Sequence, residues 1–332
     1  MIHLRIVSRG GKTAPALEVL ESAESVCNVV LLEGAARRPD GDLILADVAR
    51  EDASVVISGL RELGISEDGS ISLDEIDTQL SEHAEIAVER AKGAPADAVV
   101  WEEVEARTNE NVELSGTFLA FMVMATLLAG VGIYEDSAIL IVGAMVVGPE
   151  FGPLAGFCVA AVHKRRELAL RSGLALALGF PLAITAVYLA TLAFKATGLF
   201  TDDFSQEGHS LANIISEPDF FTFFVAACAG AAGMLSLSTA KSGALIGVLI
   251  SVTTIPAAAN IGVSAAYQDG DAWRGSVAQL AINLGSIIAA GTAVLYVQRL
   301  LYLRRKQRLR ADEGRRELRP TSPATTRSRP SS

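Results

Sequence analysis

The sequence predicts an α-helical multi-pass membrane domain preceded by a small α+β domain. Three observations lead to this fold class. The chain is charged and acidic to about residue 111, whereas residues from about 117 to 303 are almost all apolar and small. The apolar region divides into six segments, each near the ~20 residues that a helix needs to span a bilayer. In residues 1–77, short apolar runs instead alternate with turn residues, as in a compact α+β domain.

Residues 1–77 are expected to fold with the element order βαββαβ. Thr13 is suited to cap the first helix and Gly64 to end the second. This order is that of the ferredoxin-like split fold, which small regulatory ligand-binding domains also adopt, so a regulatory role is an analogy from fold alone. The expected strands are Ile2–Ser8, Val26–Glu33, Leu43–Ala49 and Ile71–Ile76, and the expected helices are Ala14–Ser25 and Glu51–Leu63.

A helical connector is expected over residues 78–115, with helices at Ser81–Lys92 and Ala98–Thr108 separated near Pro95. Trp101 lies on the apolar face of the second of these helices. Two roles remain open for it: an anchor near the membrane surface, or a packing residue against the soluble domain.

The membrane domain is expected over residues 116–303, followed by a basic, disordered tail over 304–332. Links between the apolar segments alternate in charge. The link around 163–171 and the link with Lys241 are basic, as is the chain after the last segment at 304–310. The links with Glu135 and Asp136 and with Asp269 and Asp271 are acidic. Since cytoplasmic loops carry excess Lys and Arg, both termini are expected in the cytoplasm of a cell whose inner or plasma membrane the protein spans. The six spans are expected at 116–133, 137–162, 168–194, 220–239, 242–267 and 276–300.

The second apolar segment holds helix-breaking residues and a carboxylate at its centre. In lipid, backbone groups released by a broken helix need partners, and a glutamate at that depth is unfavourable unless it faces protein, water or an ion. Glu150 is therefore a candidate to hold a cation or to cycle a proton. Its structural alternative is to accept hydrogen bonds from backbone N–H groups released around the prolines. The residues of this break are Gly148, Pro149, Glu150, Gly152 and Pro153.

The fifth apolar segment repeats this pattern, with Pro256 aligned on Pro153. Because three spans separate the two segments, they run in opposite directions, as in an inverted repeat whose broken helices point at a midplane site. The alternative is that Pro and Gly are simply frequent in membrane helices. The remaining candidates for such a site, which also fit ordinary helix–helix hydrogen bonds, are Thr253, Thr254, Asn260 and Asn283.

No metal site, cofactor or catalytic group is expected. The three cysteines and four histidines are scattered, without metal-ligand spacing. One membrane carboxylate without a partner acid or base is insufficient for catalysis, so the chain is not expected to be an enzyme. The net charge of −10 belongs mainly to the first region and gives no indication of nucleic-acid binding.

In Trp101–Thr108, Ser137–Ala160 and Lys241–Val263, the chain resembles the domain-of-unknown-function 389 family of hydrophobic bacterial and archaeal proteins. The resemblance implies a multi-pass membrane protein and carries no catalytic residues. The paired broken helices and Glu150 favour a transporter or channel-like protein for an ion or small solute, with a regulatory N-terminal domain. The alternatives are a membrane-anchored sensor or scaffold and, less well supported, an intramembrane enzyme. Besides the lipid bilayer, the expected partner is a second copy of the chain, because the membrane domain is small and rich in glycine.

Overall fold

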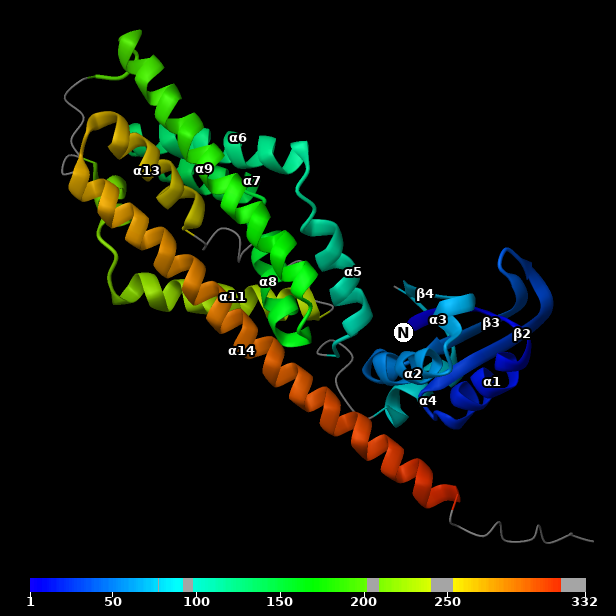
Figure 1. Ribbon diagram of the computed structural model, residues 1–332. Coiled ribbons are helices and arrows are strands. Elements are labelled where there is room, and N and C mark those ends of the chain that lie inside the picture. Colours follow the sequence, from blue (N-terminus) through cyan, green and yellow to red (C-terminus); the bar gives the residue numbers. More distant parts are fainter. Residues whose placement is uncertain (77, 92–97, 202–208, 240–252, 318–332) are drawn as a thin grey trace, which may run out of the picture. The chain divides into compact units, whose positions relative to one another are not determined.

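The computed structural model describes residues 1–76, 78–91, 98–201, 209–239 and 253–317, and the chain divides into two compact units (Figure 1). The N-terminal unit comprises Met1–Val48, Val55–Ala87 and the chain from Gln298 onward. The helical unit comprises Ala49–Ser54 and Val88–Val297. Two helices, α2 (Arg50–Glu62) and α14 (Gly270–Glu317), therefore contribute residues to both units.

The N-terminal unit contains a four-stranded antiparallel sheet with the strand order β2-β3-β1-β4. The predicted element order βαββαβ is present in the chain, with two short additions that the sequence did not predict, the 3-10 helix η1 (Gly10–Lys12) and the helix α3 (Ile65–Asp68). The main elements are β1 (Ile2–Ser8), α1 (Thr13–Ser22), β2 (Val26–Arg37), β3 (Asp40–Val48), α2 and β4 (Ser70–Glu75).

Buried and accessible side chains alternate along β1, and the buried ones form part of the core of this unit. Ile2, Leu4 and Ile6 are fully buried, as are Leu20 of α1 and Leu60 of α2. Side chains of a strand point to opposite faces in turn, so one face of β1 supplies the core while the other remains accessible. The sheet thus has one closed and one open face.

Two details of this unit differ from the expectation. Thr13 is the first residue of α1 and not its N-cap, because η1 leads directly into the helix, and its hydroxyl donates to Asp42 Oδ2 at 2.7 Å. The hairpin of β2 and β3 is also longer than predicted. Arg37 pairs with Asp40, which leaves only Arg38 and Pro39 between the strands.

The connector forms two helices, α4 (Glu82–Arg90) and α5 (Trp101–Asn111). Both lie close to the predicted ranges. The predicted interruption at Gly93–Pro95 lies outside the described residues.

The helical unit contains several helices that are long and apolar enough to cross a membrane: α6 (Gly116–Tyr134), α9 (Arg166–Ala196), α11 (Phe220–Ser238) and α14. The pair α7 (Ala138–Val147) and α8 (Phe151–His163) is bent by 51° and adds a fifth if it crosses as one broken span. The predicted fifth segment is described only from Thr253, where α13 (Thr254–Tyr267) follows, so six spans remain a prediction.

Helix α13 lies in the core of the helical unit, and nearly all of its side chains are buried. It packs against α6 and α9, and Gly262 permits the closest approach to α9. A Cβ atom at Gly262 would lie 2.9 Å from the carbonyl oxygen of Ile184 and 3.0 Å from Val187 Cβ. Any larger residue at this position would push the two helices apart.

Helix α14 is longer than the predicted span. A helix over 276–300 and a disordered tail from 304 were expected, yet α14 continues without interruption from Gly270 to Glu317. The chain after Leu303 is rich in Arg, Lys, Gln and Leu, which favour helix, and holds no proline before Pro320. Within the N-terminal unit, Lys306 Nζ of α14 lies 3.1 Å from Glu62 Oε1 of α2. The predicted tail from residue 318 lies outside the described residues.

Candidate functional site

The break between α7 and α8 consists of three residues. α7 ends at Val147, α8 begins at Phe151, and Glu150 is the N-cap of α8. Pro153 is the third residue of α8, in the first turn, where a missing backbone N–H leaves no intrahelical hydrogen bond unmade. The residues that suggested a broken helix therefore end one helix and start the next.

Helix α13 starts in the same way. Thr253 is its N-cap and Pro256 its third residue, as Pro153 is in α8. The two helices have 14 and 13 residues, and each ends at a left-handed C-cap, Gln268 for α13 and Lys164 for α8. The sequence alignment of Pro256 with Pro153 thus pairs equivalent positions of two short buried helices.

The starts of these two helices meet in space. The hydroxyl of Thr254 donates a 2.8 Å hydrogen bond to Glu150 Oε1. Gly148 lies against the same place, since a Cβ atom there would be 2.7 Å from Cγ1 of Ile255 and would collide with Glu150 Oε2. Glycine at this position therefore lets the break between α7 and α8 approach α13.

Helix α14 adds a third side to this cluster. Asn283 Nδ2 donates a 2.7 Å hydrogen bond to Thr253 Oγ1. Thr254 is fully buried, Asn283 is 1% exposed and Glu150 is 3% exposed. Side chains that are far apart in sequence therefore form one buried polar cluster at the start of both short helices.

The two oxygens of Glu150 differ. Oε1 accepts from Thr254, whereas Oε2 has no hydrogen-bond partner among the residues that the structure describes. The side chain makes no capping hydrogen bond at the start of α8. The expected structural role, accepting from N–H groups of the broken helix, remains a prediction. Asn283 Oδ1 also lacks a partner within the described part of the chain.

One predicted site residue lies elsewhere. Asn260 is fully buried but donates from Nδ2 to Ser276 Oγ at 2.8 Å, further along α13 from Glu150. Asn260 is therefore the predicted residue that lies away from Glu150. Its partner Ser276 was not predicted, although the spacing of polar residues in α14 could have indicated it. Pro149 and Gly152 are half-buried and shape the backbone of the break.

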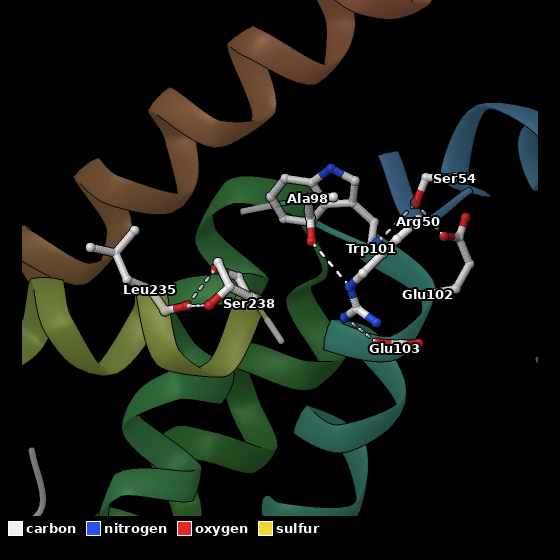
Figure 2. A network of polar contacts seen from close by, with 9 residues as sticks. Arg50, Ser54, Ala98, Trp101, Glu102, Glu103, Leu235 and Ser238 are labelled. Carbon is white, nitrogen blue, oxygen red and sulfur yellow. Dashed lines mark hydrogen bonds and ion pairs between the residues drawn. The ribbon is translucent and has the colours of Figure 1, made fainter. Parts of the chain in front are cut away.

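A second polar network lies at α5 (Figure 2). Arg50 Nη2 lies 2.8 Å from Glu103 Oε2, and the hydroxyl of Ser54 donates to Glu102 Oε2 at 2.6 Å. The backbone N–H of Trp101 in turn donates to Ser54 Oγ at 3.0 Å. The first turn of α2 is thereby attached to the start of α5.

Two roles were left open for Trp101. Its side chain is buried, with the ring centroid 5.0 Å from that of His163, so it packs against the end of α8. Glu105 of α5 lies 3.1 Å from both His163 Nδ1 and Arg165 Nη2. Helix α5 thus connects the start of α2 with the end of α8, the helix that begins at Glu150.

Metal-ligand groups are absent from the described residues, since no three or more His, Cys, Asp or Glu side chains lie together in a way that could hold a metal ion. Within this part of the chain, the ligands available to a cation at Glu150 are its carboxylate and neutral oxygens.

Comparison with known proteins supports the resemblance seen in the sequence. Residues 145–289 match the family model "Domain of unknown function (DUF389)", which confirms the resemblance over that range. An uncharacterized protein of the archaeon Methanocaldococcus jannaschii is 26% identical over 178 residues, which are 54% of this chain and 52% of that protein. The chain thus spans about half the length of this curated relative. No solved structure matches the chain.

Proposed function

Since residues 145–289 match DUF389, whose description assigns no activity, we propose from the geometry that the protein is a membrane transporter or channel-like protein for an ion or small solute. Glu150 is the observation that carries this proposal. Its carboxyl group is buried where two short helices begin, with one oxygen bonded to Thr254 and the other without a partner in the described chain. Because such an oxygen is unfavourable in an apolar interior, a passing ion or solute that supplies its partner explains its retention.

The two short helices support an inverted repeat as the architecture of the transporter. α8 and α13 place a proline at the same position and begin at one polar cluster. Transporters built from inverted repeats form their midplane sites from broken helices of this kind. The first part of the predicted fifth span, which precedes α13, lies outside the described residues.

The charge of the helix ends supports an orientation. Lys164, Arg165 and Arg166 follow α8, whereas Glu135 and Asp136 follow α6. With positive residues inside, both termini face the cytoplasm, and the protein resides in the inner or plasma membrane of the cell. The N-terminal unit, whose element and strand order suit a ferredoxin-like fold, acts as a regulatory domain, and the chain assembles as a homo-oligomer without enzymatic activity.

A flux experiment tests this function. Purified protein is placed in liposomes, and proton entry is followed with pyranine and sodium entry with ²²Na⁺. Glu150→Gln keeps the shape of the side chain and removes its charge, and it should reduce flux to the level of empty liposomes. The matched control is Glu167→Gln, an exposed carboxylate at the start of α9, which should transport as the unchanged protein does.

Two outcomes would contradict the proposal. Flux that Glu150→Gln leaves unchanged would remove Glu150 from the transport pathway. Absence of flux from the unchanged protein, for protons, sodium and a panel of small solutes, would instead favour the alternative of a membrane-anchored sensor or scaffold. The compact N-terminal unit with its own core is the observation that favours this alternative.

A further inference from the structure

Helix α14 carries a line of buried polar residues through its apolar part. Ser276, Gln279, Asn283 and Ser286 are each at most 5% exposed. Their spacing of three and four residues places them on one face of the helix. We call this set the polar stripe. In a helix that crosses a membrane, polar side chains buried against protein are uncommon and require partners.

The polar stripe faces α13. Asn260 of α13 donates to Ser276, and Asn283 donates to Thr253, the N-cap of α13. Since the earlier residue of α14 meets the later residue of α13, the two helices are antiparallel and the stripe follows α13 along its length. At one end it reaches the cluster of Glu150 and Thr254. Its other end lies near the start of α14, where Asp269 accepts from the backbone N–H of Ala272 at 3.0 Å.

The atoms without partners along this line have one chemical character. Gln279 Oε1, Asn283 Oδ1 and Glu150 Oε2 are buried, and none has a hydrogen-bond partner in the described residues. All three are acceptors, while the amide nitrogens of Asn260 and Asn283 donate to hydroxyls. A bound species that interacts favourably with these three oxygens must supply hydrogen-bond donors or positive charge, so an anion does not fit. Oxygen ligands of this kind suit hard cations.

We propose that a small monovalent metal cation passes along the interface of α13 and α14, between Glu150 and the start of α14 near Asp269. Gln279 and Asn283 provide neutral oxygen ligands along this pathway. This proposal rests on the proposed function and specifies its substrate class. A single carboxylate balances one positive charge, whereas sites for divalent cations usually combine several carboxylates. Asp269 and Asp271 attract cations to the entrance.

Sodium binding to the full-length protein in detergent micelles tests the pathway. Thermal unfolding is followed in increasing NaCl, with N-methyl-D-glucamine chloride replacing it to hold the ionic strength constant. A cation that binds only the folded protein raises the melting temperature in a saturable way. LiCl and KCl series show the preference for cation size.

The variants remove one acceptor at a time without changing side-chain size. Gln279→Met should raise the half-saturating NaCl concentration about tenfold, the effect of losing one neutral polar contact. Asn283→Leu should raise it at least as much, but it also removes the hydrogen bond to Thr253. If that variant does not fold, Gln279→Met carries the test. Thr292→Val is the control, because Thr292 follows Asn283 by about two and a half helical turns and so falls on the opposite face of α14. It should leave the sodium dependence unchanged.

The outcomes separate this inference from the function on which it rests. Equal sodium dependence of Gln279→Met and the unchanged protein would overturn the pathway, as would absence of any specific sodium effect. If flux through liposomes still depended on Glu150 in that case, transport would stand with a different substrate. Sodium binding that requires Gln279, without any flux, would instead support the site and overturn transport.

Discussion

Asp47 in the N-terminal sheet and Glu150 in the helical unit are both buried carboxylates, and their surroundings differ. In the sheet, Asp47 Oδ1 accepts from His3 Nδ1 at 2.7 Å, and Oδ2 accepts from Asn28 Nδ2 at 2.7 Å and Gln79 Nε2 at 2.9 Å. In the helical unit, one side chain of the described residues, Thr254, donates to Glu150, and it does so to Oε1. Asp47 thus holds separate segments together with both oxygens, whereas Glu150 retains an oxygen that can bind something else. The number of donors around a buried carboxylate distinguishes a structural residue from a candidate binding residue.

The largest expected difference is in stability. Asp47→Ala leaves three donors without their acceptor and should lower the free energy of unfolding of the N-terminal unit by about 2–4 kcal/mol. Glu150→Gln removes a charge that has a single donor and should change the stability of the helical unit by less than about 1 kcal/mol. Hydrogen exchange of the full-length protein measures both, through protection of β1 and β3 and of α8. A larger loss for Glu150→Gln than for Asp47→Ala would make Glu150 the structural residue.

Glycine at the break provides a second test. Gly148→Ala places a methyl group against Ile255 and Glu150 Oε2 and should destabilise the helical unit by about 1–3 kcal/mol. Gly143→Ala in α7 is the control, because nothing lies within 4 Å of the added atom. Because alanine favours helix more than glycine, Gly143→Ala should leave the free energy of unfolding unchanged or raise it by up to about 1 kcal/mol. Thermal unfolding in micelles compares the two, and equal effects would show that the approach of the break to α13 is not tight.

The single donor to Glu150 gives a smaller effect. Thr254→Val removes the hydroxyl and should cost about 1–2 kcal/mol, because Glu150 then has no donor at Oε1. The control is Thr126→Val, since the buried hydroxyl of Thr126 donates to the carbonyl groups of Met122 and Val123 in its own helix. That variant should change stability by less than about 1 kcal/mol. If both variants have the same melting temperature, the hydrogen bond between Thr254 and Glu150 does not stabilise the folded protein.

The smallest effect concerns Asp42 in the N-terminal unit. The backbone N–H of Gly34 and, next, the hydroxyl of Thr13 donate to its carboxylate and lower the pKa of Asp42. A lowered pKa stabilises the folded state above the unfolded value of about 4, and this contribution is lost as pH falls through the folded pKa. The melting temperatures of Asp42→Asn and the unchanged protein should therefore differ by a constant amount from pH 7 to 5 and converge below pH 4. A constant difference down to pH 3 would contradict this assignment.

Local sequence signals predicted the elements of the molecule well. Alternation of apolar residues located the strands. Pro153 and Pro256 predicted interruptions of two spans, and the structure begins α8 and α13 two residues before these prolines. The bond between Glu150 and Thr254 joins residues 104 positions apart and depends on packing that no local pattern encodes. The sequence could therefore name the members of the cluster but not distinguish Thr254, which bonds to Glu150, from Asn260, which does not.

Charged and polar residues were the hardest to place. Arg50 follows a strand in an acidic region and reads as a surface residue, yet it is 5% exposed and paired with Glu103. Gln279 and Ser276 lie in a mostly apolar segment, so their position on one face of the helix is not apparent from the sequence. Such residues acquire their roles only from the helix that lies opposite, which the chain order does not reveal.

Helix α2 has a consequence for dissecting the protein. Its first turn belongs to the helical unit and the rest to the N-terminal unit, so the predicted boundary at residue 77 does not separate two independent pieces. If a protease site were introduced within residues 92–97 and cut, Arg50 and Ser54 would still hold Glu103 and Glu102 across the nick. The two fragments should co-purify until these contacts are broken. A continuous chain between α4 and α5 is then dispensable for assembly, and fragments expressed separately offer a way to reassemble the protein from parts.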